Sequence, residues 1–444
     1  MAKNWAEMTP AERRAERFKR WLAPKGVKFN SQQAEKQYRE RVTRFIKAVN
    51  LEEPDRVPVM LPTSFFPLYY AGSNLKEAMY DYGVMKKAWL KFMKDFSDMD
   101  LFSGPGFVLP ARVLEIIDHK LHIWPGHGLP DNSTSYQYVE KEYMKADEYD
   151  KLILDPTDYW LRSYMPLEAG AFKPLAKLPH LTPFIGIPVA YLSSFGDPEV
   201  IECLKKMMAA GKEARKWGEI VGEISRTALA SGYPQLGFGG AGAPFDFLAD
   251  MCRGTQGTFL DIYRQPEKIL ETIDRLTPLI IKTALETLEN SDCPITMMPL
   301  HKGDNTFMSP KQFEKFYWPS LKKVMLALIE EGFVPMPFAE GNYEPRLEMI
   351  KDFPKGSAVW YFEHMDMAKA KKILGDTCCI AGNVPVSVLS IGEPAEVKEH
   401  CRRLIDACAE GGGYILAGSA SIEKGNPDNL RAMMAAAREY GTYR

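Results

Sequence analysis

Three side chains that could do acid–base or metal chemistry each follow an apolar stretch of this sequence. They are His301, Glu340 and Glu363. A histidine and two carboxylates can bind zinc or another divalent ion. Without a metal, the same groups could act as general acid and base, because neighbouring charges move each other's pKa. The residue types leave both kinds of chemistry open.

Alternating strand and helix patterns must position these side chains. The apolar run Ile295–Leu300 predicts a buried strand, and Phe333–Phe338 predicts a second one. Between them a helix is predicted to begin with Ser309 as N-cap and Pro310 in the first turn, and to end at Gly332. Such a βαβ unit brings the polar residues after both strands to one edge of a parallel sheet.

The same unit repeats toward the C-terminus. Ser357–Phe362, Thr377–Ala381 and Gly413–Leu416 are further predicted strands, each followed by a helical stretch. So many successive units favour a (β/α)₈ barrel, in which functional residues lie at the carboxyl ends of the strands. Asn383 and Ser419 follow two of these strands, so we expect them at the same mouth as the histidine and the two glutamates.

The N-terminal half is less regular. Residues 1–50 are rich in Arg, Lys and Glu, and predict an N-terminal helical extension that caps or flanks a barrel formed by residues 51–444. At about 107–230 the alternation breaks, which we interpret as an insertion after the second strand, and within it Leu121–Trp124 and Ser135–Glu140 predict a hairpin around a polar loop. It is either a lid or docking surface over the mouth, or a simple elaboration. The first three strands are predicted at Val57–Leu61, Met99–Ser103 and Tyr233–Phe238.

A glycine-rich stretch, Pro234–Gly257, follows the third predicted strand. It has no phosphate-loop pattern, so its glycines serve either close ligand contact or packing. Asp246 and Asp250 lie four residues apart on the helix that follows, and therefore share one face. Both are candidates for substrate binding.

Composition excludes several classes of protein. The 444 residues are 45% hydrophobic, and the formal net charge of −2 does not indicate a nucleic acid or an anionic membrane as partner. No segment approaches the roughly 20 apolar residues of a membrane span, and the start lacks a signal peptide's apolar core, so we expect a cytoplasmic protein. The seven scattered cysteines predict neither disulfides nor a thiolate zinc site. We expect His119 and His122 to have surface roles.

Several motifs together resemble the uroporphyrinogen decarboxylase superfamily. The segment GFGGAGAPFDFLADMCRGTQGTFLDIYRQPEKI is similar to its glycine-rich third-strand signature, and the resemblance continues through MSPKQFEKFYWPSLKKV, FAEGN, GNVP and NPDNLRAM. It covers residues 230–433 well and 51–110 loosely. The resemblance implies a (β/α)₈ barrel with its pocket at the mouth.

One activity of this superfamily is porphyrinogen decarboxylation, and the sequence departs from it. The arginine-containing segment that grips the substrate's carboxylates is replaced by PVMLPTSFFPLYYAG, which has no arginine. The positions of the family's central Asp, pocket Tyr and last-strand His are matched here by Gly104, Asp250 and Ser419. A porphyrinogen substrate with eight carboxylates needs cationic partners, and the arginines that would supply them are missing here. A decarboxylase-type lyase on a carboxylated ring compound is therefore kept as the first alternative only.

The sequence also resembles the other branch of this superfamily. Members of that branch transfer a methyl group between a small molecule and a cobalamin carried by a separate corrinoid protein. Its thiol-using members bind zinc through His-x-Cys and a later Cys, and those positions hold Phe338, Glu340 and Ser419 here. The resemblance therefore implies a corrinoid-dependent methyltransferase of the O-demethylase type. In it, Glu340, His301 and Glu363 would be catalytic.

The expected cofactor is cobalamin on a partner protein, and zinc bound by the three catalytic candidates is a further option. We expect a corrinoid protein and a small methyl donor or acceptor as partners, no nucleic acid, no membrane, and a monomer or homodimer. A non-catalytic barrel that binds a ligand or partner is the second alternative. The candidates for substrate binding are Asp246, Asp250, Asn342, Phe338, Trp360, Asn383 and Ser419.

Overall fold

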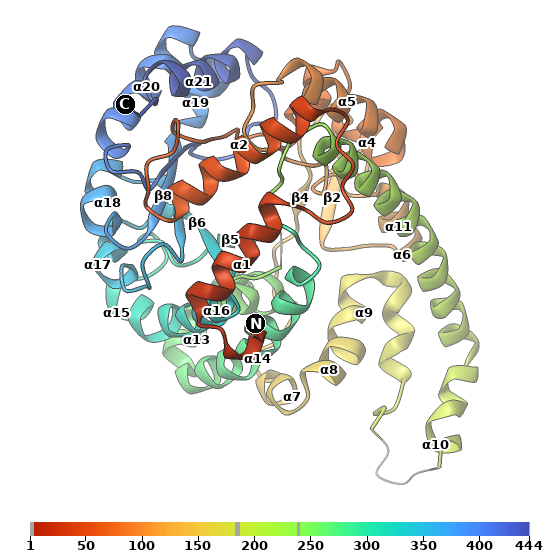
Figure 1. Cartoon of the computed structure of the whole chain (residues 1–444). Coiled ribbons are helices and arrows are strands. Elements are labelled where there is room, and N and C mark those ends of the chain that lie inside the picture. The colour runs from red at the N-terminus through yellow and green to blue at the C-terminus, as the bar shows by residue number, and fades with distance from the viewer. Residues whose placement is uncertain (1–3, 183–186, 238–239, 444) are drawn as a thin grey trace.

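A curled parallel sheet forms the centre of the fold, with helices on its outer side (Figure 1). The computed structural model describes residues 4–182, 187–237 and 240–443. Within them the sheet has six strands in the order β1-β9-β8-β7-β6-β5. The strands are β1 (Val59–Met60), β5 (Ile295–Leu300), β6 (Val334–Asn342), β7 (Val359–His364), β8 (Cys379–Val384) and β9 (Tyr414–Gly418).

The strands of the C-terminal half lie where their apolar runs predict them. β5 has the predicted bounds, but β6 continues past Phe338 to Asn342. It does so because it still pairs with β7 beyond a register shift between Ala339 and Asn342. The side chain of Ser309 caps the helix between β5 and β6 by accepting a hydrogen bond from Gln312 N.

The predicted strand Met99–Ser103 is not a regular strand. Its backbone makes one hydrogen bond to a neighbouring predicted strand, from Phe102 N to Pro234 O at 2.9 Å, whereas Met99 N bonds locally to Phe96 O. Asp100 instead uses its side chain, which accepts a hydrogen bond from Val59 N of β1 at 2.9 Å. Because the side chain of Asp100, and not its backbone, binds Val59 N, this segment forms no regular hydrogen-bond ladder with β1.

The predicted strand Tyr233–Phe238 is also irregular, and Phe238 lies outside the described residues. A single bridge joins Gly237 to Thr296 of β5. Pro234 has no N–H to donate, which limits any ladder at this edge. The described sheet is therefore a half-barrel with two irregular segments along its open edges.

The helices that cover the sheet pack apolar faces against it. On α16, for example, Leu321, Val324 and Leu328 are fully buried. The covering elements are α12 (Pro244–Asp246), η5 (Phe247–Cys252), α13 (Gly254–Arg264), α14 (Pro266–Leu288), α15 (Pro310–Gln312), η6 (Phe313–Tyr317), α16 (Trp318–Glu330), η7 (Glu344–Arg346), α17 (Leu347–Ile350), α18 (Met367–Leu374), α19 (Val386–Ile391), α20 (Pro394–Cys408) and α21 (Pro427–Glu439).

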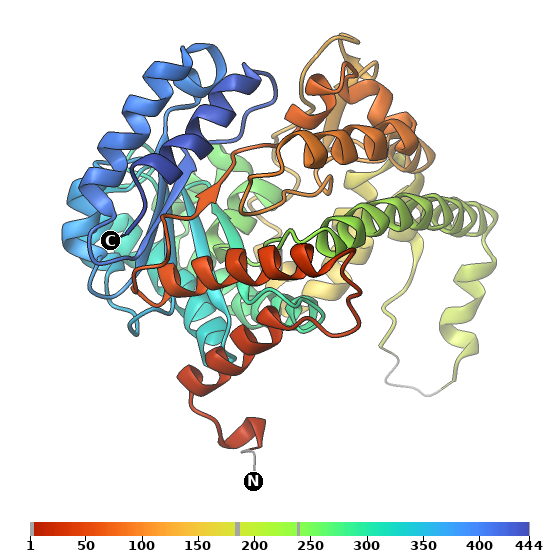
Figure 2. The same ribbon diagram turned by 45° about the horizontal axis from the view of Figure 1, so that its top comes forward.

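Two N-terminal helices, α1 (Pro10–Leu22) and α2 (Gln32–Val49), lie across the amino ends of the strands (Figure 2). They share one core with the first residues of the strands: Trp21 and Phe45 pack in the same cluster as Ile295 of β5. The short 3-10 turn η1 (Trp5–Glu7) precedes them. This end of the sheet is covered, so the carboxyl ends of the strands are the open side.

Residues 66–230, which follow β1, form a helical arm and a small hairpin. The predicted hairpin is present, with β2 (His122–Pro125) antiparallel to β4 (Gln137–Tyr138) and a short β3 (Gly128–Leu129) beside β2. The long helix α11 (Pro198–Ala230) runs along the arm. The other elements are α3 (Phe66–Tyr70), α4 (Leu75–Tyr80), α5 (Tyr82–Asp95), α6 (Ala111–Ile117), α7 (Tyr149–Leu154), α8 (Pro156–Tyr159), η2 (Trp160–Tyr164), α9 (Met165–Glu168), η3 (Gly170–Lys177), α10 (Val189–Leu192) and η4 (Ser193–Gly196).

None of the helices in the described ranges is long and apolar enough to cross a membrane.

The buried Asp100 joins the N-terminal helices to the first strand. Its carboxylate accepts from Arg44 Nη1 and Arg56 Nη2, both at 2.6 Å. We expect Asp100→Ala to lower the free energy of unfolding by about 3 kcal/mol, because it removes the carboxylate shared by Arg44, Arg56 and Val59 N and leaves Arg44 with Asp55 alone. Urea denaturation measures this loss. The control Asp98→Ala, at an exposed carboxylate, should cost less than about 1 kcal/mol; an equal loss in both variants would contradict the prediction.

Candidate functional site

A cavity of about 790 Å³ opens at the carboxyl ends of β5 and β6. His301 follows β5 and Glu340 lies near the end of β6, so the structure brings these two predicted residues together. The two aspartates of the glycine-rich segment also line it. The charged residues of its lining are Glu140, Asp246, Asp250, His301, Lys302 and Glu340.

His301 is held between two carboxylates. Its Nδ1 lies 2.5 Å from Asp250 Oδ2, and its Nε2 lies 3.8 Å from Glu340 Oε1. Burial alone would lower the pKa of His301, but the hydrogen bond and negative charge of Asp250 outweigh it, with help from Asp246 and Glu340, and raise the pKa to about 9. The ring is therefore an imidazolium at neutral pH, and its Nε2–H faces Glu340.

Asp246 is buried and holds the loop that carries His301. Its carboxylate accepts hydrogen bonds from His301 N at 2.8 Å, Lys302 N at 3.0 Å and Tyr317 OH at 2.6 Å. Burial and the nearby charge of Asp250 raise the pKa of Asp246 to about 6. With both oxygens occupied, Asp246 shapes the site instead of presenting a free carboxylate to a substrate.

Glu340 is the carboxylate of the cavity that is least engaged by the protein. Burial raises its pKa; the charge of His301 opposes this shift, and that of Glu363 adds to it. The next residue, Gly341, has a φ of +81°, and a Cβ there would overlap the carboxylate of Asp304. The sharp turn after Glu340 therefore depends on glycine.

Glu363, Asn383 and Ser419 line a second, smaller cavity of about 330 Å³. Glu363 Oε2 accepts a hydrogen bond from Gly341 N at 2.7 Å, which engages one oxygen of its carboxylate. Asn383 Nδ2 donates to Glu363 O, and Ser419 Oγ accepts from Val386 N. The expected single mouth is thus divided in two, because the backbone after Glu340 continues between the two groups.

Residues 187–440 match the family model described as uroporphyrinogen decarboxylase (URO-D). This chain belongs to the URO-D family. It is 26% identical over 199 residues to the uroporphyrinogen decarboxylases of Geobacter metallireducens and Geobacter sulfurreducens, which is 44% of this chain and 56% of each relative. The chain thus spans about half the length of the curated relatives it matches.

A solved structure with the same overall fold is a methyltransferase from Methanosarcina mazei. The TM-score is 0.56 at 17% sequence identity, and the match covers 90% of this chain and 98% of that one. At this level of identity, the similarity concerns the fold alone.

Three residues predicted to bind substrate line neither of the two cavities described for this URO-D family member. Trp360 is fully buried against Trp318 on the helix side of the sheet, because alternation along β7 directs it outward. Phe338 is partly buried inside the sheet and packs at a tilt against Tyr361, with ring centroids 4.5 Å apart. The exposed Asn342 accepts a hydrogen bond from Glu344 N and forms a turn.

The β2–β4 hairpin contributes a wall of the cavity that the sequence analysis missed. His122, Tyr138 and Glu140 line it. Glu140 Oε1 accepts a hydrogen bond from Thr255 N at 2.7 Å, which ties the hairpin to α13 and lowers the pKa of Glu140. The hairpin pattern was visible in the sequence, but nothing local indicated that it docks against the glycine-rich segment.

His119 and His122 are not exposed surface residues, contrary to the expectation from the sequence, and of the two His122 lines the cavity. His119 Nε2 and His122 Nδ1 are 2.9 Å apart, and His119 is buried. Burial lowers the pKa of both rings, that of His119 to about 4. Both are therefore neutral near pH 7.

The predicted zinc ligands of this family member do not converge. His301 turns Nδ1 to Asp250, and Glu363 turns to Gly341 N. Among the residues that the structure describes, no group of three or more His, Cys, Asp or Glu side chains is placed to hold a metal ion. The donor set therefore does not fit zinc, and no step of the proposed chemistry uses it.

We expect Asp250→Asn to lower the pKa of His301 by about 1–3 pH units, because it removes the opposite charge nearest to the imidazolium. Titration of the His301 ring followed by NMR measures this pKa. The exposed Asp98→Asn is the control and should leave it unchanged. A His301 pKa near 9 in the Asp250 variant would show that this pair does not set its protonation.

We expect Gly341→Ala to destabilise the protein by about 1–3 kcal/mol, because alanine is strained at this φ and crowds Asp304. Thermal and urea unfolding measure the effect. Gly218→Ala on α11 is the matched control, since its Cβ would meet nothing within 4 Å. It should stabilise the helix by about 0.5–1 kcal/mol, so loss of stability in both variants would contradict the explanation.

Proposed function

We propose that this chain is a corrinoid-dependent methyltransferase that moves a methyl group between a small methyl donor and a cobalamin carried by a partner protein. The charge of the cavity is the observation that carries the proposal. Four carboxylates line it, against the imidazolium of His301 and one lysine, Lys302. A porphyrinogen with many carboxylates would meet repulsion here, whereas a methyl ether or related donor needs no cationic grip.

The proposed chemistry assigns a proton to His301. When a methyl group leaves an oxygen, that oxygen gains negative charge and must be protonated or stabilised. His301 would donate the Nε2 proton, while Asp250 holds the ring at Nδ1 and Asp246 fixes the backbone. Glu340, 3.8 Å from Nε2, would return a proton from solvent.

A corrinoid group bound here would supply the nucleophile that takes up the methyl group. His301 and Glu340 keep 39% and 41% of their side-chain surface exposed, which leaves an open approach from outside. We therefore place the corrinoid protein over this mouth. Glu363 would act indirectly, through its hydrogen bond to Gly341 N beside Glu340.

We also propose that the half-barrel closes as a (β/α)₈ barrel within residues 51–444. Residues 99–103 and 233–238 would take the second and third strand positions, with residues 107–230 inserted between them. The bonds from Phe102 N to Pro234 O and from Gly237 N to Ile295 O support this order. Residues 1–50 form the N-terminal extension.

A decarboxylase-type lyase remains the alternative, because the curated relatives are uroporphyrinogen decarboxylases. A non-catalytic barrel that binds a ligand or partner is the second alternative. The charge of the cavity favours neither, since Lys302 is the one lysine or arginine among its described lining residues.

The deciding experiment offers the purified chain reduced cobalamin with a panel of methoxylated aromatic compounds, and separately a porphyrinogen. We expect methylation of cobalamin and no decarboxylation. His301→Gln should reduce the rate about 10²–10⁴-fold, and His364→Gln, whose side chain is exposed, should not. Because His301 must be protonated to donate, the rate should fall as the pH rises through about 9.

Consumption of the porphyrinogen would identify the chain as a decarboxylase and reject the proposal. Unchanged methyl transfer in His301→Gln would reject the role of His301 alone. If the chain binds ligands but turns over neither class of substrate, the non-catalytic alternative is correct.

A further inference from the structure

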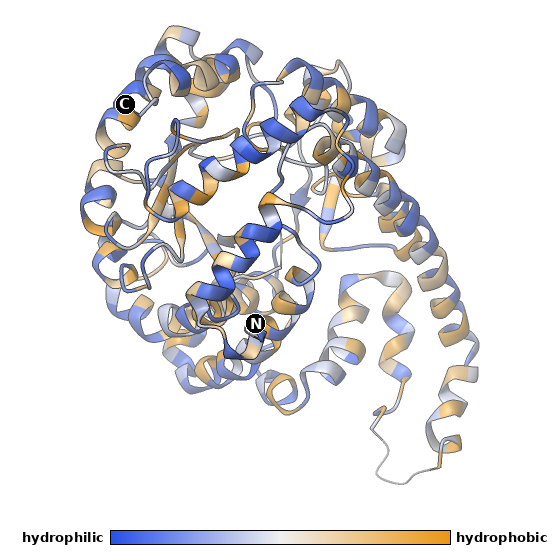
Figure 3. Cartoon of the chain, in the orientation of Figure 1, coloured by the Kyte–Doolittle hydropathy of each residue, from blue (hydrophilic) through white to orange (hydrophobic). Residues whose placement is uncertain are grey.

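Two histidines at the β2–β4 hairpin form a hydrogen-bonded pair that the proposed chemistry does not use. His119 Nε2 and His122 Nδ1 are 2.9 Å apart, and His122 lines the cavity from β2. Figure 3 shows hydrophilic and hydrophobic residues together on the strands of this hairpin. The hairpin wall is therefore able to place a polar group in the cavity.

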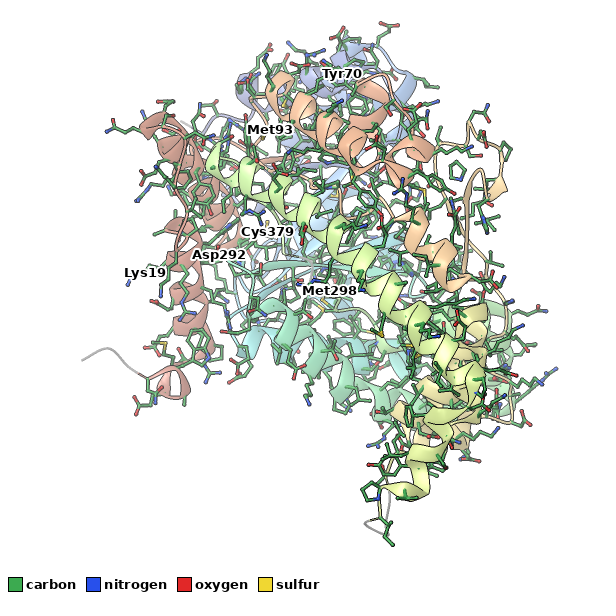
Figure 4. The ribbon with its side chains drawn as sticks, turned by 90° about the vertical axis from the view of Figure 1, so that its right-hand side faces the viewer. Lys19, Tyr70, Met93, Asp292, Met298 and Cys379 are labelled. Carbon is green, nitrogen blue, oxygen red and sulfur yellow. The ribbon has the colours of Figure 1, made fainter. Side chains whose placement is uncertain are left out.

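The backbone around His119 fixes its ring beside β2. Asp118 ends α6 in the left-handed region, with a φ of 52°, and His119 N then bonds to Leu114 O at 2.9 Å. A β-bridge joins His119 to Ala169 of the arm. Figure 4 views the molecule from the side of the arm, with α11 crossing in front of Met298 of β5. The buried His119 thus connects the arm to the wall of the cavity.

Aromatic contacts hold the ring of His122 in place. Its centroid lies 5.4 Å from that of Tyr138 and 5.5 Å from that of Tyr136, and both contacts are edge-to-face. Because His119 engages Nδ1, Nε2 is the nitrogen of His122 that is left for a ligand. Within the described residues this Nε2 has no hydrogen-bond partner, and it is not fully buried. It is therefore accessible from the cavity that His122 lines.

The position of two protons decides what His122 offers to a ligand. Burial lowers the pKa of both rings, so each is neutral near pH 7 and carries one N–H. One of these protons lies in the bond between the two rings. If His119 donates in that bond, the other proton is on His122 Nε2, and if His122 donates, it is on His119 Nδ1.

Two observations place the other proton on His122 Nε2. His119 Nδ1 is buried and has no hydrogen-bond partner among the described residues. In protein interiors, N–H groups without an acceptor are rarer than acceptors without a donor. The cavity also holds more carboxylates than cations, and this negative charge favours an N–H that faces it. His119 therefore donates to His122, and His122 presents a neutral N–H to the cavity.

The rest of the cavity wall indicates which ligand this donor would meet. Phe247, Met251 and Phe307 line the cavity. Apolar walls with a few fixed polar groups suit a flat apolar ring whose substituents those groups hold. In the proposed function, His301 already serves the oxygen that loses its methyl group. The N–H of His122 is a further donor on another wall, so it fits a second acceptor oxygen on the same ring.

We propose that His122 is a substrate-binding residue, and that its Nε2–H donates a hydrogen bond to a second oxygen substituent of an aromatic methyl ether. His119 is a positioning residue, because its own N–H fixes the tautomer of His122. The choice of a methyl ether rests on the proposed function, whereas the tautomer rests on the hairpin alone. A ring without the second oxygen binds less well, because the N–H then loses water without gaining a partner.

Nitrogen NMR of the full chain tests the tautomer. Near pH 7, we expect chemical shifts that show His122 protonated at Nε2 and unprotonated at Nδ1, and His119 likewise protonated at Nε2. The chain has seven histidines, and the signals of these two are assigned by their loss in His122→Gln and in His119→Gln. A proton on His122 Nδ1, or on both of its nitrogens, would overturn the proposal.

Binding measured by calorimetry without cobalamin tests the donor role. The unaltered chain should bind at least one of the ortho, meta and para isomers of dimethoxybenzene about 3- to 10-fold more tightly than methoxybenzene, which lacks the second oxygen. His122→Phe keeps a ring but no nitrogen, and should abolish this preference. His122→Gln keeps an amide donor near the position of Nε2, and should retain part of it. His127→Phe, at an exposed position of the same hairpin, is the matched control and should retain all of it.

Thermal unfolding establishes which variants are folded, and His122→Leu replaces His122→Phe if the latter is not. A preference that persists without the imidazole would overturn the proposal. Equal binding of the two kinds of ring by the unaltered chain, or binding of neither, would also overturn it.

Methyl transfer to cobalamin is a separate measurement that distinguishes this inference from the proposed function. If the preference depends on His122 but no methyl group is transferred from any of these compounds, the proposed function fails and the donor role of His122 stands. If methyl transfer occurs but the preference is independent of His122, the proposed function stands and this inference fails.

Discussion

The buried carboxylate of Asp246 is the constraint on which the geometry of the cavity depends. Two backbone N–H groups, of His301 and Lys302, and the hydroxyl of Tyr317 donate to it from two different elements. Each donor left without a partner in this interior would cost about 1–3 kcal/mol. The loop after β5 is therefore held in one conformation, and the direction of the imidazole follows from it.

Asp250 controls the charge of the imidazole whose position Asp246 fixes. It lies one turn after Asp246, so the helix that carries both aspartates places one under the backbone of His301 and the other against its ring. The two aspartates thus have different roles, although they share one face of the helix. The carboxylate that contacts the ring keeps it charged, and the buried one keeps it in place.

The regular parts of this arrangement could be predicted from the sequence, because they depend on local patterns. The strand Ile295–Leu300, the cap at Ser309 and the shared face of Asp246 and Asp250 all follow from residue spacing. The docking of the hairpin with Glu140 and the contact of Tyr317 with Asp246 join segments 71 or more residues apart, and carry no local signal.

The division of the mouth into two cavities shows how one backbone detail can override a correct topology. The parallel strands do bring His301, Glu340 and Glu363 to one edge, as their positions after apolar runs indicate. The register shift in β6 then lets Gly341 N take the carboxylate of Glu363. A carboxylate that accepts from a backbone donor is no longer free to complete a metal site. The three residues whose types could bind zinc are instead an imidazolium, a neighbouring carboxylate and a support for the turn between them.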